Sequence, residues 1–355
     1  MSRFLLVNPF GIGDVLFTTP VARAIRDSYP AGFLGYWCNQ RVAPMLQYNP
    51  DIDTAFGVSR GDLKKTWSES KIKGITDFYG LLRQLKTGHY DAAIDFSLDC
   101  RYSLLAQLAG IKRRIGFDYK KRGRFLTDKL ALDGYSGKHV VDYYLELLKF
   151  LEVEPRSRQL YLYTGQQEQS QSKKFLEYHG IHEQEAVIGI APGAGASWGE
   201  DAARKHWPAA RFAQIADRII DELKVKVVLL GDASERTIAD VIIYSMKQKP
   251  IDMVGKTSLA QLAALIQRLR ILLTNDGGPL HMAVALGVRT VSIFGPVDEK
   301  VYGPYPPSEK HTVLKAGLEC RPCYEQFRLK PCDKEKECIT LIDTAEVFEA
   351  LRRLL

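Results

Sequence analysis

The sequence predicts an α/β protein of two domains, each built around a parallel β-sheet. Short apolar runs typical of buried strands alternate with longer segments whose apolar residues recur at helical spacing. The alternation stops in the middle of the chain and then resumes. A length of 355 residues is typical of two domains. Strands that alternate with helices pair in parallel, so each half should form its own sheet.

The first half contains three strand-like runs and three segments of helical periodicity. We expect strands at residues 4–7, 33–37 and 92–96, and helices at residues 15–28, 77–86 and 101–108. Their order along the chain predicts consecutive β-α-β units.

The same pattern returns in the second half. Strands are expected at residues 187–191, 225–230, 271–274 and 290–294, with helices at 209–223, 235–246, 259–270 and 280–286. We therefore predict a first domain over residues 1–160, a polar linker region over 161–185 and a second domain over 186–340. The segment 341–355 is an amphipathic helix expected to pack back across the domains.

Composition places the chain among soluble globular proteins, with 46% hydrophobic and 26% charged residues. A run of about 18 apolar residues, as a membrane-spanning helix needs, is absent from the sequence. Before the first short apolar run, Arg3 is the only charged residue, which does not resemble a secretory signal. We expect a cytoplasmic protein.

Positive charge is concentrated in one segment of the first half, although the net charge of the whole chain is only +7. Residues 112–129 carry the basic side chains Lys112, Arg113, Arg114, Lys120, Lys121, Arg122, Arg124 and Lys129. Such a segment favours an anionic partner. Interspersed aromatic residues also leave open a nucleic-acid or membrane-surface module, but charge runs are usually solvated and an RNA-binding signature is absent from this sequence, so no nucleic-acid partner is expected.

Two glycine-rich turns follow apolar runs, at residues 8–14 and at residues 275–281. Each turn leads from a predicted strand into a predicted helix. Backbone N–H groups at a helix N-terminus favour anionic groups, and glycine lets a ligand approach the backbone closely. Ligands of open α/β sheets bind beyond the carboxyl ends of the strands, so two such turns in two halves suggest one cleft between two domains.

Three motifs in order resemble those of the heptosyltransferases, glycosyltransferase family 9. They are Asn8-Pro9-Phe10-Gly11-Ile12-Gly13-Asp14, Lys205-His206-Trp207-Pro208 after Pro192-Gly193-Ala194, and Asn275-Asp276-Gly277-Gly278-Pro279-Leu280-His281. The resemblance implies the GT-B architecture, two Rossmann-like domains facing a central cleft. It also implies inverting, metal-independent transfer of a heptose from ADP-L-glycero-D-manno-heptose to the lipopolysaccharide inner core. Such an acceptor implies peripheral attachment to the inner face of the inner membrane.

Inverting transfer is a single displacement that needs a base for the acceptor hydroxyl and stabilisation of the departing diphosphate. Asp14 matches the family's general base, although an acid at this position also suits a helix cap. The resemblance assigns donor binding to Ser197, Lys205, Glu235, Asp276, Gly277, Gly278 and His281. Each of the four ionisable residues in this set also has a structural alternative. Lys205 could be a solvated surface lysine and Asp276 a helix cap. Glu235 could serve the electrostatics of a helix start, and His281 could be a buried core histidine.

The acceptor side is assigned to Gly13 and to the basic residues Arg113, Arg114, Lys120, Lys121 and Arg122, which would meet phosphates or carboxylates of an anionic glycan. A related GT-B transferase with another nucleotide sugar or acceptor, or a GT-B epimerase, remains an alternative. The sequence does not distinguish these alternatives, because no residue pattern in it identifies the nucleotide base or the hydroxyl groups of the sugar that the enzyme binds.

No cofactor beyond the donor is required by this interpretation. Asp51-Ile52-Asp53 spells a DxD, the metal-binding signature of other transferases, but turn chemistry after Asn49-Pro50 explains it. Cys320, Cys323, Cys332 and Cys338 cluster at spacings that suit a structural zinc. A disulfide or unpaired thiols are equally open for this cluster.

Overall fold

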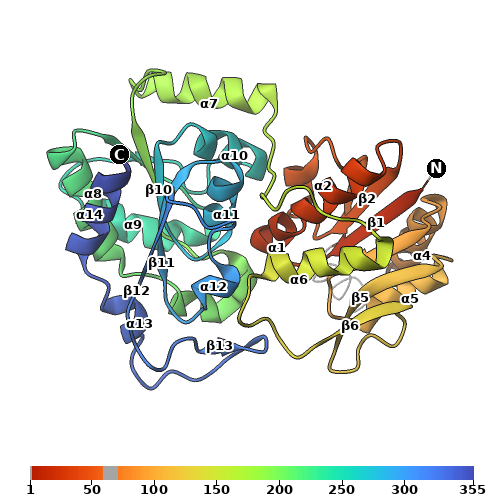
Figure 1. Ribbon diagram of the computed structural model, residues 1–355. Helices are drawn as coiled ribbons and strands as arrows, with labels where there is room; N and C mark the ends of the chain where they lie inside the picture. The colour runs from red at the N-terminus through yellow and green to blue at the C-terminus, as the bar shows by residue number, and fades with distance from the viewer. Residues whose placement is uncertain (1, 59–70) are drawn as a thin grey trace. The chain divides into compact units, whose positions relative to one another are not determined.

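The computed structural model describes residues 2–58 and 71–355. The chain divides into two compact units, Met1–Tyr161 and Leu162–Leu355. Each unit contains a six-stranded sheet whose neighbouring strands all pair in parallel. Figure 1 shows both sheets with helices packed around them. The parallel sheets predicted for the two halves are confirmed.

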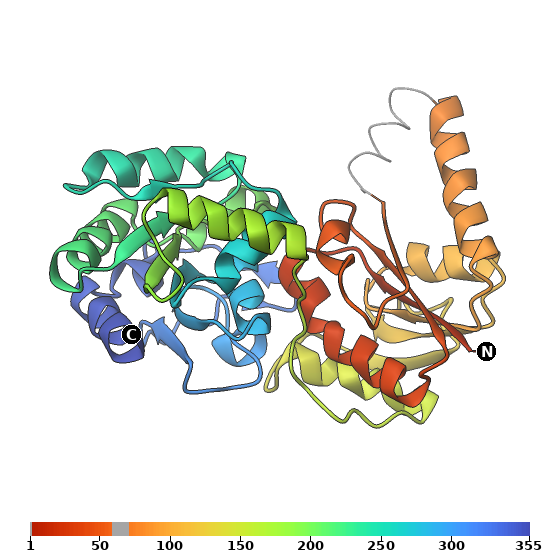
Figure 2. The ribbon, with the colours of Figure 1, turned by 90° about the horizontal axis from the view of Figure 1, so that it is seen from above.

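The first unit has the strand order β3-β2-β1-β4-β5-β6. Its strands are β1 (Arg3–Asn8), β2 (Phe33–Cys38), β3 (Thr54–Gly57), β4 (Ala92–Asp95), β5 (Arg113–Tyr119) and β6 (Asp128–Leu132). Its helices are α1 (Ile12–Phe17), α2 (Thr19–Ser28), α4 (Lys71–Thr87), α5 (Cys100–Leu108) and α6 (Val140–Glu146), with 3-10 turns η1 (Ala43–Leu46) and η2 (Leu147–Leu151). Leu5, Val7 and Ala93 pack under α4 and α5 on one face, and α2 contacts α6 on the other (Figure 2).

The second unit repeats this order as β12-β11-β10-β7-β8-β9. Its strands are β7 (Val187–Ala191), β8 (Lys226–Leu229), β9 (Ile251–Asp252), β10 (Ile271–Asn275), β11 (Arg289–Phe294) and β12 (His311–Lys315), and a separate antiparallel hairpin joins β13 (Tyr324–Glu325) to β14 (Arg328–Leu329). Its helices are α7 (Gln166–Tyr178), α8 (Ala209–Glu222), α9 (Arg236–Ser245), α10 (Leu259–Gln267), α11 (Gly278–Ala285), α12 (Glu299–Tyr302), α13 (Glu337–Thr340) and α14 (Thr344–Leu354), with 3-10 turns η3 (Ala196–Arg204) and η4 (Ala233–Glu235).

The strand order places a topological switch point in each sheet. The chain first adds strands on one side of β1 and then on the other, so that β1 and β4 are the switch pair. The corresponding pair in the second unit is β7 and β10. Ligands of open α/β sheets bind where such strands end, and both glycine-rich turns follow these strands.

The helix expected over residues 15–28 is two helices, which corrects the prediction. It breaks at Thr18, whose hydroxyl donates to the carbonyl of Val15 at 2.7 Å. Pro20 lies in the first turn of α2, where its missing N–H costs nothing. The apolar spacing continues through the break, which is why periodicity alone predicts one helix.

The region expected to be a polar linker, residues 161–185, contains helix α7. This helix packs against α10, and Gln261 Nε2 donates to Gln171 Oε1 at 3.0 Å. Leu176 is buried at the contact and gives the otherwise polar helix an apolar anchor. The C-terminal helix α14 packs on α8, β10 and β11, which all belong to the second unit.

Candidate functional site

Asp14 lies in the first turn of α1, directly after the turn that follows β1. Asn8 shapes this turn, since its Nδ2 donates to the Asp14 carbonyl at 2.9 Å and its Oδ1 accepts from the Phe10 N–H at 3.2 Å. Asp14 Oδ2 accepts from the Gly11 N–H at 3.3 Å. The capping role is therefore present, and the role of Asp14 as general base stays a prediction. Gly13 precedes Asp14 in the same helix turn.

The basic segment is divided between the two ends of β5. Arg113 Nε pairs with Asp128 Oδ2 at 3.2 Å, and its guanidinium also donates to the Phe150 carbonyl. Arg114 donates to the carbonyls of Phe125 and Ile111, each at 2.6 Å, and burial lowers its pKa. Both arginines thus hold the amino end of β5 together, and the acceptor role expected for them stays a prediction.

Lys120, Lys121 and Arg122 follow β5 at its other, carboxyl end. All three are exposed, and Lys120 and Lys121 lie in a turn with φ of 51° and 58°. This is the edge of the sheet at which Asp14 also lies, with β4 between β1 and β5. The acceptor role expected for these three basic residues stays a prediction.

Asp95, at the carboxyl end of β4, was not expected from the sequence pattern. It is 7% exposed, lies opposite Val7 of β1 in the register, and its Oδ1 accepts from the Ser97 N–H at 2.8 Å. Burial raises the pKa of Asp95 from 3.8 to about 7. An acid that ends an otherwise apolar strand is the signal by which sequence could have indicated it.

Asp95→Asn should stabilise the protein at pH 8 by on the order of 2 kcal/mol, because the folded state then no longer holds a buried carboxylate. In the unfolded chain Asp95 ionises near pH 3.8, whereas in the folded protein it ionises near pH 7. The stability of the wild type should therefore fall as the pH rises between these values and level off above them. Denaturant unfolding from pH 4 to pH 8 tests this, and an equal effect of the variant at both pH values would contradict it.

Lys205 and Asp276 form a buried ion pair where β7 and β10 end. Lys205 Nζ lies 2.5 Å from Asp276 Oδ2, and the two residues are 3% and 4% exposed. Asn275 holds the surrounding segments, because its Oδ1 accepts from the Trp207 N–H at 3.2 Å and its Nδ2 donates to the Pro192 carbonyl at 2.6 Å. The two sequence motifs that contain these residues, far apart in the chain, therefore meet at the switch point.

Trp198, a residue of the turn η3, packs against the Lys205 end of the ion pair. The Lys205 Nζ atom lies 4.2 Å from the centroid of its ring, a cation–π distance. Lys205 is therefore not the solvated lysine of the structural alternative. Ser197 lies beside Trp198 in η3, and its donor-binding role stays a prediction.

Glu235 ties together the loops that follow β7 and β8. Its Oε1 accepts from the Gly195 N–H at 3.3 Å and its Oε2 from the Asp232 N–H at 3.0 Å, and burial raises its pKa. A Cβ on Gly193 would lie 1.5 Å from Glu235 Oε1, so this approach requires glycine. The acid thus has a structural role, which leaves its expected contact with the donor ribose as a prediction.

Gly277, Gly278 and His281 mark the start of α11. Gly277 is the N-cap, Gly278 is the first helical residue and His281 is buried in the first turns. A Cβ on Gly277 would lie 3.2 Å from the carbonyl oxygen of Ala194, so the turns after β7 and β10 approach each other closely. Lys205 and the N–H groups at this helix start together suit a diphosphate.

The two candidate metal motifs have other surroundings. Asp51 pairs with Arg23 Nε at 3.1 Å and Asp53 with Arg26 at 2.6 Å. The Asp51 N–H donates to Asn49 Oδ1 at 3.0 Å, which is turn chemistry of the expected kind. The four clustered cysteines are free thiols. Among the residues that the structure describes, no group of three or more His, Cys, Asp or Glu side chains is arranged to hold a metal ion. Of the alternatives left open for the cysteines, a zinc site is therefore not proposed.

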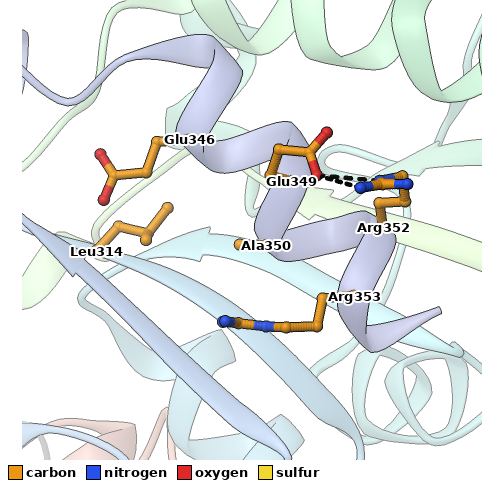
Figure 3. Close-up of a pocket in the computed structure, with 6 residues that line it drawn as sticks. All are labelled: Leu314, Glu346, Glu349, Ala350, Arg352 and Arg353. Atoms are coloured by element: carbon orange, nitrogen blue, oxygen red, sulfur yellow. Dashed lines mark hydrogen bonds and ion pairs between the residues drawn. The ribbon is translucent and has the colours of Figure 1, made fainter.

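A surface pocket of about 590 Å³ lies between α14 and β12 (Figure 3). None of the site residues expected from the sequence lines this pocket. Leu314, Glu346, Glu349, Ala350, Arg352 and Arg353 line it, and Glu349 pairs with Arg352 at 2.6 Å. In residues 2–58 and 71–355, no helix combines the length and apolarity that crossing a membrane requires.

A family model described as glycosyltransferase family 9 (heptosyltransferase) matches residues 78–332. The chain belongs to glycosyltransferase family 9. It is therefore a glycosyl-transferring enzyme, and the resemblance inferred from the three motifs is confirmed. Lipopolysaccharide heptosyltransferase 3 of Escherichia coli is 24% identical over 354 residues, which cover 97% of this chain and 96% of the relative.

Solved structures of this family support the same fold. The family 9 glycosyl transferase from Veillonella parvula DSM 2008 has a TM-score of 0.83 at 26% identity and covers 99% of this chain and 97% of its own. The ADP-heptose lps heptosyltransferase II of E. coli has a TM-score of 0.77 at 23% identity, with coverages of 99% and 98%. The family 9 chain thus has the predicted GT-B fold.

Proposed function

We propose that this family 9 enzyme transfers a heptose, with inversion and without a metal ion, from ADP-L-glycero-D-manno-heptose to an anionic acceptor of the lipopolysaccharide inner core. The buried Lys205–Asp276 pair at the start of α11 is the observation that carries the donor assignment. The E. coli and Haemophilus influenzae relatives named as lipopolysaccharide or lipooligosaccharide heptosyltransferases support the acceptor class.

In this proposal the donor diphosphate binds to Lys205 and to the N–H groups of Gly277 and Gly278. The ammonium turns from Asp276 to the phosphate and neutralises the negative charge that grows on the leaving group. Asp276 is then left beside the donor sugar, where it accepts hydrogen bonds from sugar hydroxyls. Glu235 accepts from the ribose hydroxyls with the acceptor positions that Gly195 and Asp232 do not use.

Asp14 accepts the proton of the acceptor hydroxyl as that oxygen bonds to the anomeric carbon and the carbon–diphosphate bond breaks. The products are the extended glycan and ADP. Lys120, Lys121 and Arg122 bind phosphate or carboxylate groups of the acceptor. A lipid-linked acceptor makes peripheral contact with the inner face of a membrane part of the proposal.

Calorimetric titration of the purified protein with ADP, UDP, GDP and dTDP, in the presence of EDTA, tests the donor assignment. We expect saturable binding of ADP and at least about tenfold weaker binding of the other three, a difference of about 1.4 kcal/mol. Equal binding of all four would contradict the ADP assignment. Absence of binding for every nucleotide would overturn the proposed donor site.

A further inference from the structure

The cysteine-rich segment lies against the donor candidate residues, although the proposed function gives it no role. Arg321 donates to the carbonyls of Gly295, at 2.6 Å, and Val297, at 3.2 Å, both in the turn after β11. The N–H groups of Cys323 and Tyr324 donate to the Pro296 carbonyl at 2.8 and 3.1 Å. The start of this segment is thus fixed at the carboxyl edge of the second sheet.

The segment also contacts the residues that lead to Lys205. Arg204 donates to the Lys330 carbonyl at 2.6 Å, at the end of the β13–β14 hairpin. The Tyr324 ring lies 4.8 Å from the Trp198 ring, and Trp198 lies 4.2 Å from Lys205 Nζ. The Tyr302 ring also contacts Tyr324, with 5.9 Å between their ring centroids. An aromatic pair, Trp198 and Tyr324, therefore borders the Lys205–Asp276 ion pair.

The order of the strands indicates which part of the donor would lie next to Trp198 and Tyr324. Along the carboxyl edge, Glu235 follows β8, the Gly193–Gly195 turn follows β7, Asp276 follows β10 and the anchor of the hairpin follows β11. Neighbouring strand ends are about 4.8 Å apart, so these four positions span about 14 Å. If the nucleotide-sugar donor binds along this edge with its ribose at Glu235, its diphosphate lies in the middle and its sugar lies beside the hairpin.

We propose that Trp198 and Tyr324 bind the sugar ring of the nucleotide-sugar donor. A phosphate oxygen within about 3 Å of Lys205 Nζ is within about 7 Å of the Trp198 ring centroid, which brings the adjoining sugar into contact with the aromatic pair. Aromatic rings offer a large, rigid apolar face to the C–H groups of a sugar. This inference rests on the proposed donor site at Lys205.

Titrations with ADP and with ADP-heptose, on the wild type and on Trp198→Ala, Tyr324→Leu and Tyr324→Phe, separate the sugar contact from the nucleotide contact. Loss of an aromatic contact worth about 1 kcal/mol corresponds to about fivefold weaker binding. We expect Tyr324→Leu to weaken ADP-heptose binding at least about fivefold and to change ADP binding less than about twofold. Trp198→Ala also removes the ring that contacts Lys205 Nζ, so it should weaken ADP binding as well, but ADP-heptose binding by a factor at least about fivefold larger. Tyr324→Phe should retain most of the wild-type affinity. Tyr244→Leu, at a 93% exposed position on α9, is the control.

Weakening of ADP and ADP-heptose by the same factor, or of neither, would overturn the inference. The inference would also be overturned if the wild type bound ADP and ADP-heptose with the same affinity. A wild type that does not bind ADP would instead overturn the donor site on which the inference rests. Retained ADP affinity in Tyr324→Leu excludes a general folding defect, and a normal result for Tyr324→Phe assigns the loss to the aromatic ring.

Discussion

Asp14→Asn is expected to lower kcat at least about 100-fold while leaving the affinity for ADP close to that of the wild type. The amide has nearly the shape of the carboxylate, and its oxygen still accepts the Gly11 N–H, so the turn before α1 keeps its bond. It cannot accept the proton of an acceptor hydroxyl at neutral pH. Turnover assays under donor saturation, combined with ADP titration, measure the two quantities separately.

Asp14→Ala is the companion variant, because it removes the capping bond as well as the base. A lost cap costs about 1 kcal/mol of stability. We expect Asp14→Ala to be less stable than Asp14→Asn in denaturant unfolding but equally slow in turnover. If Asp14→Asn kept more than about a tenth of the wild-type kcat, the residue would be a cap and not the base.

Lys205→Ala is expected to reduce ADP affinity by at least about 30-fold and to destabilise the fold by about 3–5 kcal/mol. The binding loss follows from the removal of the cation proposed for the diphosphate. The stability loss follows because Asp276, which is 4% exposed, would be left buried without its partner 2.5 Å away. Calorimetric titration and denaturant unfolding measure the two effects.

The double variant Lys205→Ala with Asp276→Asn separates these two effects. It contains no buried charge at this position, so its stability should recover most of what Lys205→Ala loses. Its ADP affinity should nevertheless stay low when compared with Asp276→Asn alone. Normal ADP binding by the double variant would show that Lys205 serves the fold and not the diphosphate.

Much of the architecture is predictable because buried strands and amphipathic helices leave regular patterns. Strands β7 and β10 and helix α8 lie within one residue of their expected limits. Strand β5 escapes prediction, because the basic residues at its ends mask a short apolar centre around Ile115 and Phe117. A charge-rich segment is thus compatible with a strand when the long side chains find partners at its ends.

The candidate site is predictable in its residue types but not in its pairings. The motifs indicate Lys205 and Asp276 separately, whereas their contact depends on the adjacency of β7 and β10 across some 70 residues of chain. Arg113 and Arg114 show the opposite case. Their charge suggests a ligand, but nearby backbone carbonyls and Asp128 take up their hydrogen bonds. Sequence spacing does not reveal such long-range partners.

The β13–β14 hairpin belongs to neither of the two six-stranded sheets, whose hydrogen-bond ladders are complete without it. Exchanges of residues on this hairpin therefore leave both cores unchanged. Evolution can revise such an appendage at little cost to folding, as it does for binding loops carried on rigid scaffolds. Because the proposed sugar contact places Tyr324 on this hairpin, we expect changes to the hairpin to alter which donor sugar the enzyme accepts.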